Sequence, residues 1–201
     1  DRWKSVQPYG FLRNQGYFRE VCYSRLAQLM REGGYNLERQ AGIGFTIRGF
    51  PASLRQEFSE RRRQILATAD RCGVRDQDGL QAITSETRAA KQKVSATMLR
   101  SGWERRARGD LAAIRGVIAA TTGRPSPTPE FSPQEALEAA EGHVFERRST
   151  VATRDLLRDA LAHARGSVSL AALRTAFRGR VASGLIRESG DQVASAEALR
   201  A

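Results

Sequence analysis

Apolar residues recur at helical spacing over residues 17–31 and predict a helix with one apolar face. The positions on that face are Phe18, Val21, Cys22, Leu26, Leu29 and Met30. Two glycines, Gly33 and Gly34, follow directly, and glycine is common where helices end. We expect this apolar face to pack in the core, with Cys22 as an inert apolar residue within it.

The pattern then changes to alternation over residues 35–48, which predicts a two-stranded ribbon. Its apolar positions are Tyr35, Leu37, Phe45 and Ile47, on either side of a turn at residues 42–44. A second helix is expected to begin at Pro51 or Ser53 and to carry the run Ser-Glu-Arg-Arg-Arg at residues 59–63. The apolar side of this helix consists of Leu54, Phe58, Ile65 and Ala69.

The remainder of the chain reads as helices divided by a linker. Residues 76–120 predict further helices, and three prolines within residues 125–129 exclude regular structure from residues 121–129. Beyond them the pattern predicts four elements in a winged-helix-like order. These are a helix over 133–146, one over 154–164 capped by Thr153, one capped by Ser169, and a short strand. We therefore expect a mainly α fold with a small β-hairpin (α+β), divided into residues 1–120, a linker at 121–129, and residues 130–201.

Positive charge is concentrated in the middle of the chain. The net charge is +11, and residues 48–108 contain fourteen Lys and Arg against seven Asp and Glu. A polyanion is the natural partner of such a surface, because each neutralised phosphate releases counterions. A basic surface that reflects only an Arg-rich genome is the alternative interpretation.

Several classes of chemistry find no support in the sequence. There is no P-loop motif, the two cysteines are too few for a disulfide framework, and His143 and His163 stand without cysteine neighbours. We accordingly predict no catalytic residue, no metal site and no cofactor in this chain. No apolar run approaches the ~20 residues needed to span a bilayer, and there is no signal peptide. A reduced, cytoplasmic protein is the simplest interpretation, and a first residue other than Met suggests a fragment.

Three groups of residues carry a family resemblance. These are the motif Tyr17-Phe-Arg-Glu with Tyr23 and Leu26, then Gly34-Tyr35 followed by Gly44-Phe, Ile47, Gly49 and Pro51, then Glu57-Phe-Ser with Arg61 and Ile65. In this order and spacing they resemble the end of the relaxase domain in conjugative relaxases of the MobF class (TrwC- and TraI-like). Thr87, Arg88, Lys91 and Trp103 recur at comparable places. Residues 143–149 and 153–157 are similar to the start of the helicase-side region.

The resemblance implies a parent enzyme that nicks the transferred DNA strand through a tyrosine, with a divalent metal held by three histidines, and then unwinds DNA with an ATP-dependent helicase. Its catalytic tyrosines and metal histidines would precede Asp1, and its P-loop would follow Ala201. The tyrosines of this chain (Tyr9, Tyr17, Tyr23 and Tyr35) do not match the nucleophile positions. The chain itself is therefore predicted to be inactive, with metal and ATP confined to other parts of the parent.

The resemblance assigns residues 59–93 to helical fingers that close over single-stranded DNA. We expect five residues, Arg61, Arg62, Arg88, Lys91 and Lys93, to contact its phosphates, which adds affinity rather than sequence choice. Solvated helix faces and arginine stems lying on apolar surface are the structural alternatives for these residues. Other conjugation proteins are further expected partners. A non-enzymatic, winged-helix-like DNA-binding or protein-interaction module is the alternative function, and a stand-alone basic transcription regulator is the third.

Overall fold

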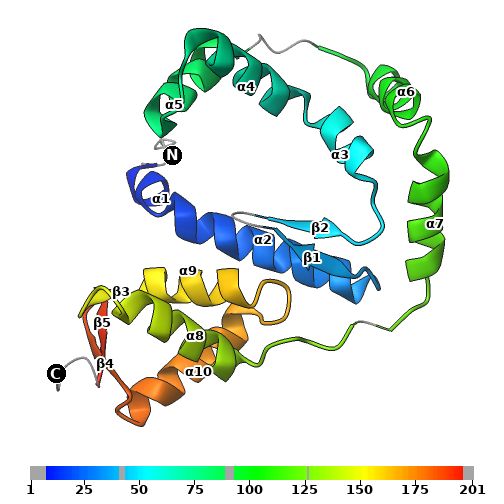
Figure 1. Cartoon of the computed structure of the whole chain (residues 1–201). Coiled ribbons are helices and arrows are strands. Elements are labelled where there is room, and N and C mark those ends of the chain that lie inside the picture. The colour runs from blue at the N-terminus through cyan, green and yellow to red at the C-terminus, as the bar shows by residue number, and fades with distance from the viewer. Residues whose placement is uncertain (1–7, 41–43, 89–92, 126, 197–201) are drawn as a thin grey trace, which may run out of the picture. The chain divides into compact units, whose positions relative to one another are not determined.

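The computed structural model describes residues 8–40, 44–88, 93–125 and 127–196 (Figure 1). Helices dominate, and the strands form two small antiparallel sheets, which confirms the expected fold class. Within the chain, two compact units can be distinguished. One combines Asp1–Arg48 with Thr121–Ala201, and the other is Gly49–Ala120. We call them the split unit and the middle unit.

The N-terminal segment of the split unit has the predicted helix and ribbon. Its elements are α1 (Tyr9–Arg13), α2 (Gln15–Glu32), β1 (Leu37–Arg39) and β2 (Phe45–Ile47). The strands are antiparallel, and Leu37 is opposite Ile47. Gly33 caps α2, and Gly34 follows with a φ of +85°. A Cβ at Gly34 would lie 2.6 Å from the carbonyl oxygen of Thr121, so only glycine fits this close approach.

The prediction that the apolar face of α2 lies in the core is wrong for most of its positions. Helix α2 buries Glu20, Ser24, Ala27 and Arg31, and from the predicted face Val21 packs, partly buried, against the core. Leu26 and Leu29 are about half exposed, and Cys22 is exposed rather than buried. The physical reason is that the polar side chains on the buried side have partners. Glu20 pairs with Arg165 at 2.5 Å, the Ser24 hydroxyl donates to the carbonyl of Val168, and Arg31 pairs with Glu130.

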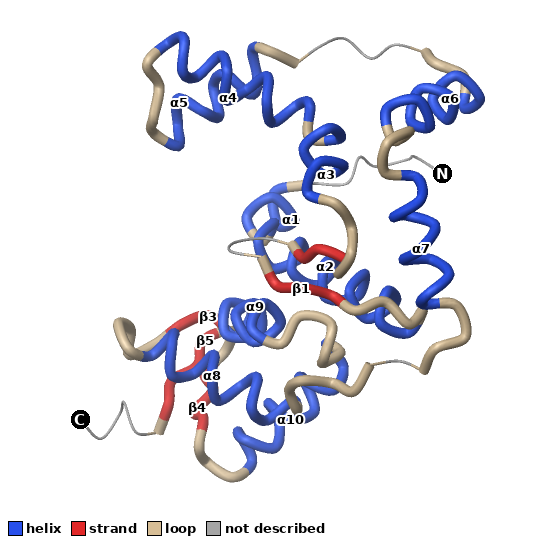
Figure 2. Tube along the Cα trace, turned by 45° about the vertical axis from the view of Figure 1, so that its right-hand side comes forward, coloured by secondary structure: helices blue, strands red, loops and turns tan. Residues whose placement is uncertain are grey.

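The C-terminal segment of the split unit has the winged-helix order. Its elements are α8 (Pro133–Phe145), β3 (Val151–Ala152), α9 (Thr153–His163), α10 (Leu170–Ala182), β4 (Ile186–Ser189) and β5 (Gln192–Ser195). Strand β5 lies between β3 and β4 in one antiparallel sheet. Figure 2 shows these short strands beside helices α8, α9 and α10. Helix, strand, two helices and a hairpin joined in this sheet order form a winged-helix topology.

This segment holds most of the apolar core. Leu137, Leu156, Leu161 and Leu173 are fully buried, together with Ile186 and Val193 from the sheet. Helix α8 begins with a complete capping box, in which Ser132 and Glu135 bind each other's backbone amides. Ser169 caps α10 as predicted. Thr153 does not cap α9: it is the first residue of that helix, and its hydroxyl donates to the carbonyl of Asp191.

The middle unit consists of helices in its described residues. They are α3 (Ala52–Phe58), α4 (Glu60–Cys72), α5 (Gln77–Glu86), α6 (Ala96–Arg106) and α7 (Leu111–Thr121), the last ending at the boundary of the unit. The single helix expected through residues 59–63 is wrong, because Ser59 separates α3 from α4. The Ser59 hydroxyl donates to the carbonyl of Arg55 at 2.6 Å, and such local bonds compete with the helix.

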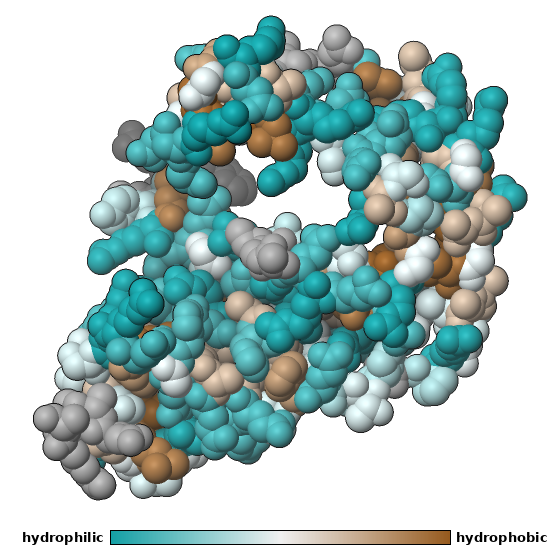
Figure 3. Space-filling view, viewed as in Figure 1, coloured by the Kyte–Doolittle hydropathy of each residue, from teal (hydrophilic) through white to brown (hydrophobic). Residues whose placement is uncertain are grey.

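The core of the middle unit is small. The buried apolar side chains of this unit are Leu54, Ala69, Ile83 and Ala107. Phe58, expected in the core, is 42% exposed, and Trp103 on α6 is 52% exposed. The face of the molecule in Figure 3 is mostly hydrophilic, with hydrophobic side chains in small separate patches.

Packing groups the chain differently from the boundary expected at residues 121–129. Helix α2 packs on α9, so the first 48 residues share a compact unit with the winged-helix segment. Part of the proline-rich stretch is held in place as well, since Arg31 donates to the carbonyl of Thr128. The assignment of the sequence segments to relaxase and helicase regions remains a prediction.

Candidate nucleic-acid interface

Arg61, the first of the predicted DNA contacts, binds other parts of the middle unit. It lies near the start of α4, and its guanidinium donates to the carbonyls of Thr84 at 2.5 Å and Thr87 at 2.6 Å. These carbonyls are at the C-terminal end of α5, where backbone acceptors have no partner within the helix. A cation there also complements the helix dipole. Arg61 therefore joins α4 to α5.

Three other predicted contacts, Arg62, Arg88 and Lys93, are exposed to solvent. Among the residues that the structure describes, their side chains have no ion pair or hydrogen bond. Arg88 follows Thr87 directly, so the Arg61 bond brings the start of α4 to the segment that carries Arg88. The fifth residue, Lys91, lies outside the described residues. No contact joins Lys93 to the other described members of the set.

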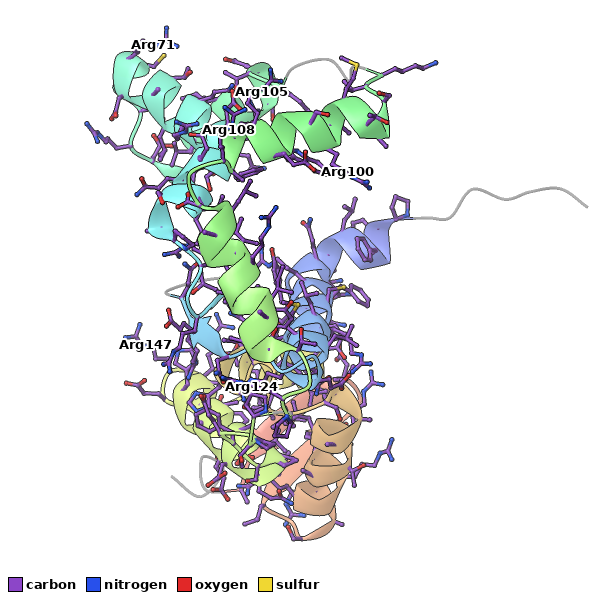
Figure 4. All side chains as sticks on the ribbon, turned by 90° about the vertical axis from the view of Figure 1, so that its right-hand side faces the viewer. Arg71, Arg100, Arg105, Arg108, Arg124 and Arg147 are labelled. Carbon is purple, nitrogen blue, oxygen red and sulfur yellow. The ribbon has the colours of Figure 1, made fainter. Side chains whose placement is uncertain are left out.

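Further cations of the middle unit also have no carboxylate partner among the described residues. They are Arg55, Arg71, Arg100, Arg105, Arg108 and Arg115. Figure 4 labels four of them: Arg71 on α4, Arg100 and Arg105 on α6, and Arg108 in the turn that follows α6. By contrast, Arg63, Arg75 and Arg106 are paired with Glu57, Asp70 and Glu57, respectively. The unpaired cations give this unit its positive surface.

Trp103 adds an aromatic face to this surface. It follows Arg100 by three residues and Leu99 by four on α6, a spacing that places the three side chains on one side of the helix. Another aromatic ring of the unit, Phe58, has a guanidinium already in place, since Arg106 stands 4.7 Å from its centroid. Exposed aromatic rings and guanidinium groups are the side chains on which unpaired bases stack.

The contacts predicted from the sequence end at Lys93 and do not include the cations of residues 100–108. Yet Glu-Arg-Arg-Ala-Arg at residues 104–108 is itself a basic run. The available signal was that only one acid stands within that run. What sequence could not show is which arginine is paired, and the structure assigns the pairs to Arg106.

The described residues show no group of three or more His, Cys, Asp or Glu side chains that could hold a metal ion. Within the same residues, no helix has the length and apolar character required to cross a membrane. The exposed cations and rings of this surface suit recognition of nucleic acid, because guanidinium groups bind phosphate oxygens and aromatic rings accept bases.

A basic helical unit with unpaired arginines, in one chain with a winged-helix segment, is typical of proteins that bind nucleic acid. A family model described as TrwC relaxase matches residues 1–109, which is more than half of the chain. The chain therefore belongs to the TrwC relaxase family, which confirms the resemblance and supports a role in conjugative relaxases. No curated protein and no solved structure matches the chain.

Proposed function

We propose that the middle unit is a non-catalytic clamp for single-stranded DNA in a conjugative relaxase. The observation that carries this proposal is the set of exposed cations without carboxylate partners in residues 49–88 and 93–120, together with the exposed ring of Trp103. Residues 49–120 contain fourteen Lys and Arg against eight Asp and Glu, a net charge of +6. Membership in the relaxase family supplies the substrate class.

We assign two roles to the predicted contacts. Arg62, Arg88 and Lys93 are free to bind phosphates, and we retain Lys91 as a proposed contact on the sequence alone. Arg61 supports the surface, because its guanidinium already binds two carbonyls. Arg100 and Trp103 extend the proposed surface along α6, where a base can stack on the ring and its phosphate can meet the guanidinium.

A salt titration of oligonucleotide binding tests the clamp directly. Binding of a fluorescent single strand is followed by anisotropy, and log affinity is plotted against log salt. Each phosphate contact on a single strand contributes a slope of about −0.7. The triple variant Arg62→Ala, Arg88→Ala, Lys93→Ala should therefore reduce the slope by about 2.

The matched control removes the same charge from exposed positions of the split unit, as Arg124→Ala, Arg147→Ala, Arg148→Ala. This control should leave the slope within experimental error of the parent value. A flat salt response of the parent chain, or equal losses in the two triple variants, would refute the clamp. Trp103→Ala should weaken binding by about 1–3 kcal/mol with little change in slope, because stacking involves no counterion release.

A second candidate function rests on the winged-helix topology of residues 130–196. This topology supports an interaction module that carries no catalytic residue, and conjugation proteins are the partners that the family suggests. The clamp and this module concern different units, so both can be present in one protein.

A further inference from the structure

The winged-helix segment contains the elements with which helix-turn-helix proteins bind DNA, but here another helix stands at the face that would contact the DNA. In helix-turn-helix proteins the second helix, here α10, enters the major groove. Its outward face carries Arg174, Thr175 and Arg178, all exposed. The N-terminal part of α2 stands at this face, because the hydroxyl of Tyr17 accepts a hydrogen bond from Arg174 at 3.2 Å. Two residues of this face, Arg174 and Arg178, therefore line a cavity beside α2.

This cavity lies within the split unit and has a volume of about 480 Å³. Leu157 and Phe177, which are 5% and 6% exposed, contribute buried apolar surface to its lining. Tyr17 and Phe18 contribute two aromatic rings from α2. The second ring is also stacked on Phe11, with centroids 5.0 Å apart, which supports its orientation.

Charged groups of opposite sign line the same cavity. Arg154 and Asp191 pair with each other at 3.3 Å and largely cancel. Arg174 has only the neutral Tyr17 hydroxyl as its partner, and Arg178 has none among the described residues. Two guanidinium groups therefore remain available to an anion. Glu188 is the remaining acid of the lining, and its carboxylate can accept a hydrogen bond.

We propose that this cavity holds one nucleotide of a single DNA strand. Its phosphate binds Arg174 and Arg178, since guanidinium groups donate paired hydrogen bonds to phosphate oxygens. Its base enters between the rings of α2 and the apolar floor, with an exocyclic amino group directed to Glu188. The volume falls within the range of small-molecule pockets. A purely apolar ligand would leave the two guanidinium groups without partners, and a duplex would need the face of α10 that Tyr17 occupies.

The site is independent of the clamp proposed for the middle unit, and its test uses a ligand too small for a clamp. Binding of dAMP to the full chain is measured by calorimetry, and binding of a short single strand containing 2-aminopurine by fluorescence quenching. Arg178→Ala should weaken both at least about tenfold, a loss of 1.4 kcal/mol. Phe18→Ala should abolish most of the quenching, because the base loses its stacking partner.

The matched control is Arg187→Ala, which removes one exposed arginine from β4 of the same segment but outside the cavity. It should leave dAMP binding within about twofold of the parent. Arg178 has no described side-chain contact, and far-UV circular dichroism verifies that its variant is folded. The clamp triple variant at residues 62, 88 and 93 should bind dAMP as the parent does, so failure of either proposal is recognised separately.

Four outcomes would overturn the proposal. One is the absence of any dAMP or short-strand binding, and another is an equal loss in Arg178→Ala and Arg187→Ala. The third is tighter binding of a short duplex than of either single strand, with that affinity lost in Arg178→Ala, which would assign the cavity face to double-stranded DNA. Binding of dAMP without binding of the strand would restrict the site to free nucleotides, and so would also reject the strand as its ligand.

Discussion

Replacing Arg165 with alanine should destabilise the split unit strongly, although the residue belongs to a loop. Its side chain is 7% exposed and that of its partner Glu20 is 6% exposed, and their charged atoms are 2.5 Å apart. Arg165 also donates to the carbonyl of Gly44 at 2.5 Å. Removing one partner of a buried pair leaves the other charge uncompensated and costs about 3–5 kcal/mol.

A close control lies on α2, the helix that carries Glu20. Arg25 pairs with Glu32 at 3.2 Å, but both side chains are 57% exposed. Exposed pairs contribute about 0–1 kcal/mol, so Arg25→Ala should have a small effect. The double variant Glu20→Met, Arg165→Met replaces the pair by apolar side chains and should recover most of the loss, because no unpaired charge remains.

Urea unfolding followed by far-UV circular dichroism gives the free energy of unfolding of each variant. Hydrogen exchange shows which helices are destabilised. Arg165→Ala should accelerate exchange in α2 and α9, whereas the amides of α4 in the middle unit should keep their protection. Equal stability losses in Arg165→Ala and Arg25→Ala would refute the reasoning. So would a double variant as unstable as the single one, because the loss would then not come from an uncompensated Glu20.

Three further predictions concern single positions. Gly166→Ala should cost more than about 1 kcal/mol, because Gly166 has a φ of +80° and a Cβ there would lie 2.8 Å from that of Ala27; Gly142→Ala in α8, which meets nothing within 4 Å, should instead stabilise by about 0.5–1 kcal/mol in the same urea assay. Arg61→Ala should lower the exchange protection of α5 and cost about 1.5–3 kcal/mol, since two carbonyls lose a charged donor; unchanged protection would show that these bonds contribute nothing. Burial, and then the positive charge of Arg39, lower the pKa of His163 from 6.5. The stability from neutral His163 should therefore be full above about pH 6.5 and decline as pH falls through the lowered folded pKa; His163→Gln should flatten this acid limb of the unfolding midpoint, and an identical limb would contradict the assignment.

Local sequence signals predicted most of the elements. Apolar spacing located α2, and the alternating positions located β1 and β2. The helix expected from residue 133 is α8, and Ser169, the predicted cap, marks the start of α10. These signals work because capping and hydrogen-bond spacing depend on residues a few positions apart. The break between α3 and α4 at Ser59 was not predicted. The bond from the Ser59 hydroxyl to the carbonyl of Arg55 is also local, but a serine in this position does not always form it.

The candidate site was only partly predictable. Sequence located the basic middle of the chain, because charge can be counted without a fold. It could not separate Arg61, which binds two backbone carbonyls, from the neighbouring Arg62, which is exposed without a partner. The difference depends on the end of α5, more than twenty residues further along the chain.

The sequence by itself determined the helical class, the ribbon, the winged-helix order and the family to which the chain belongs. Only the tertiary structure decided which side of α2 is buried, which arginines are paired, and that residues 1–48 share a unit with residues 121–201. The reason is that burial of Glu20 and Arg31 becomes favourable only when Arg165 and Glu130 arrive from distant segments to compensate their charges. No local sequence pattern indicates such a pairing.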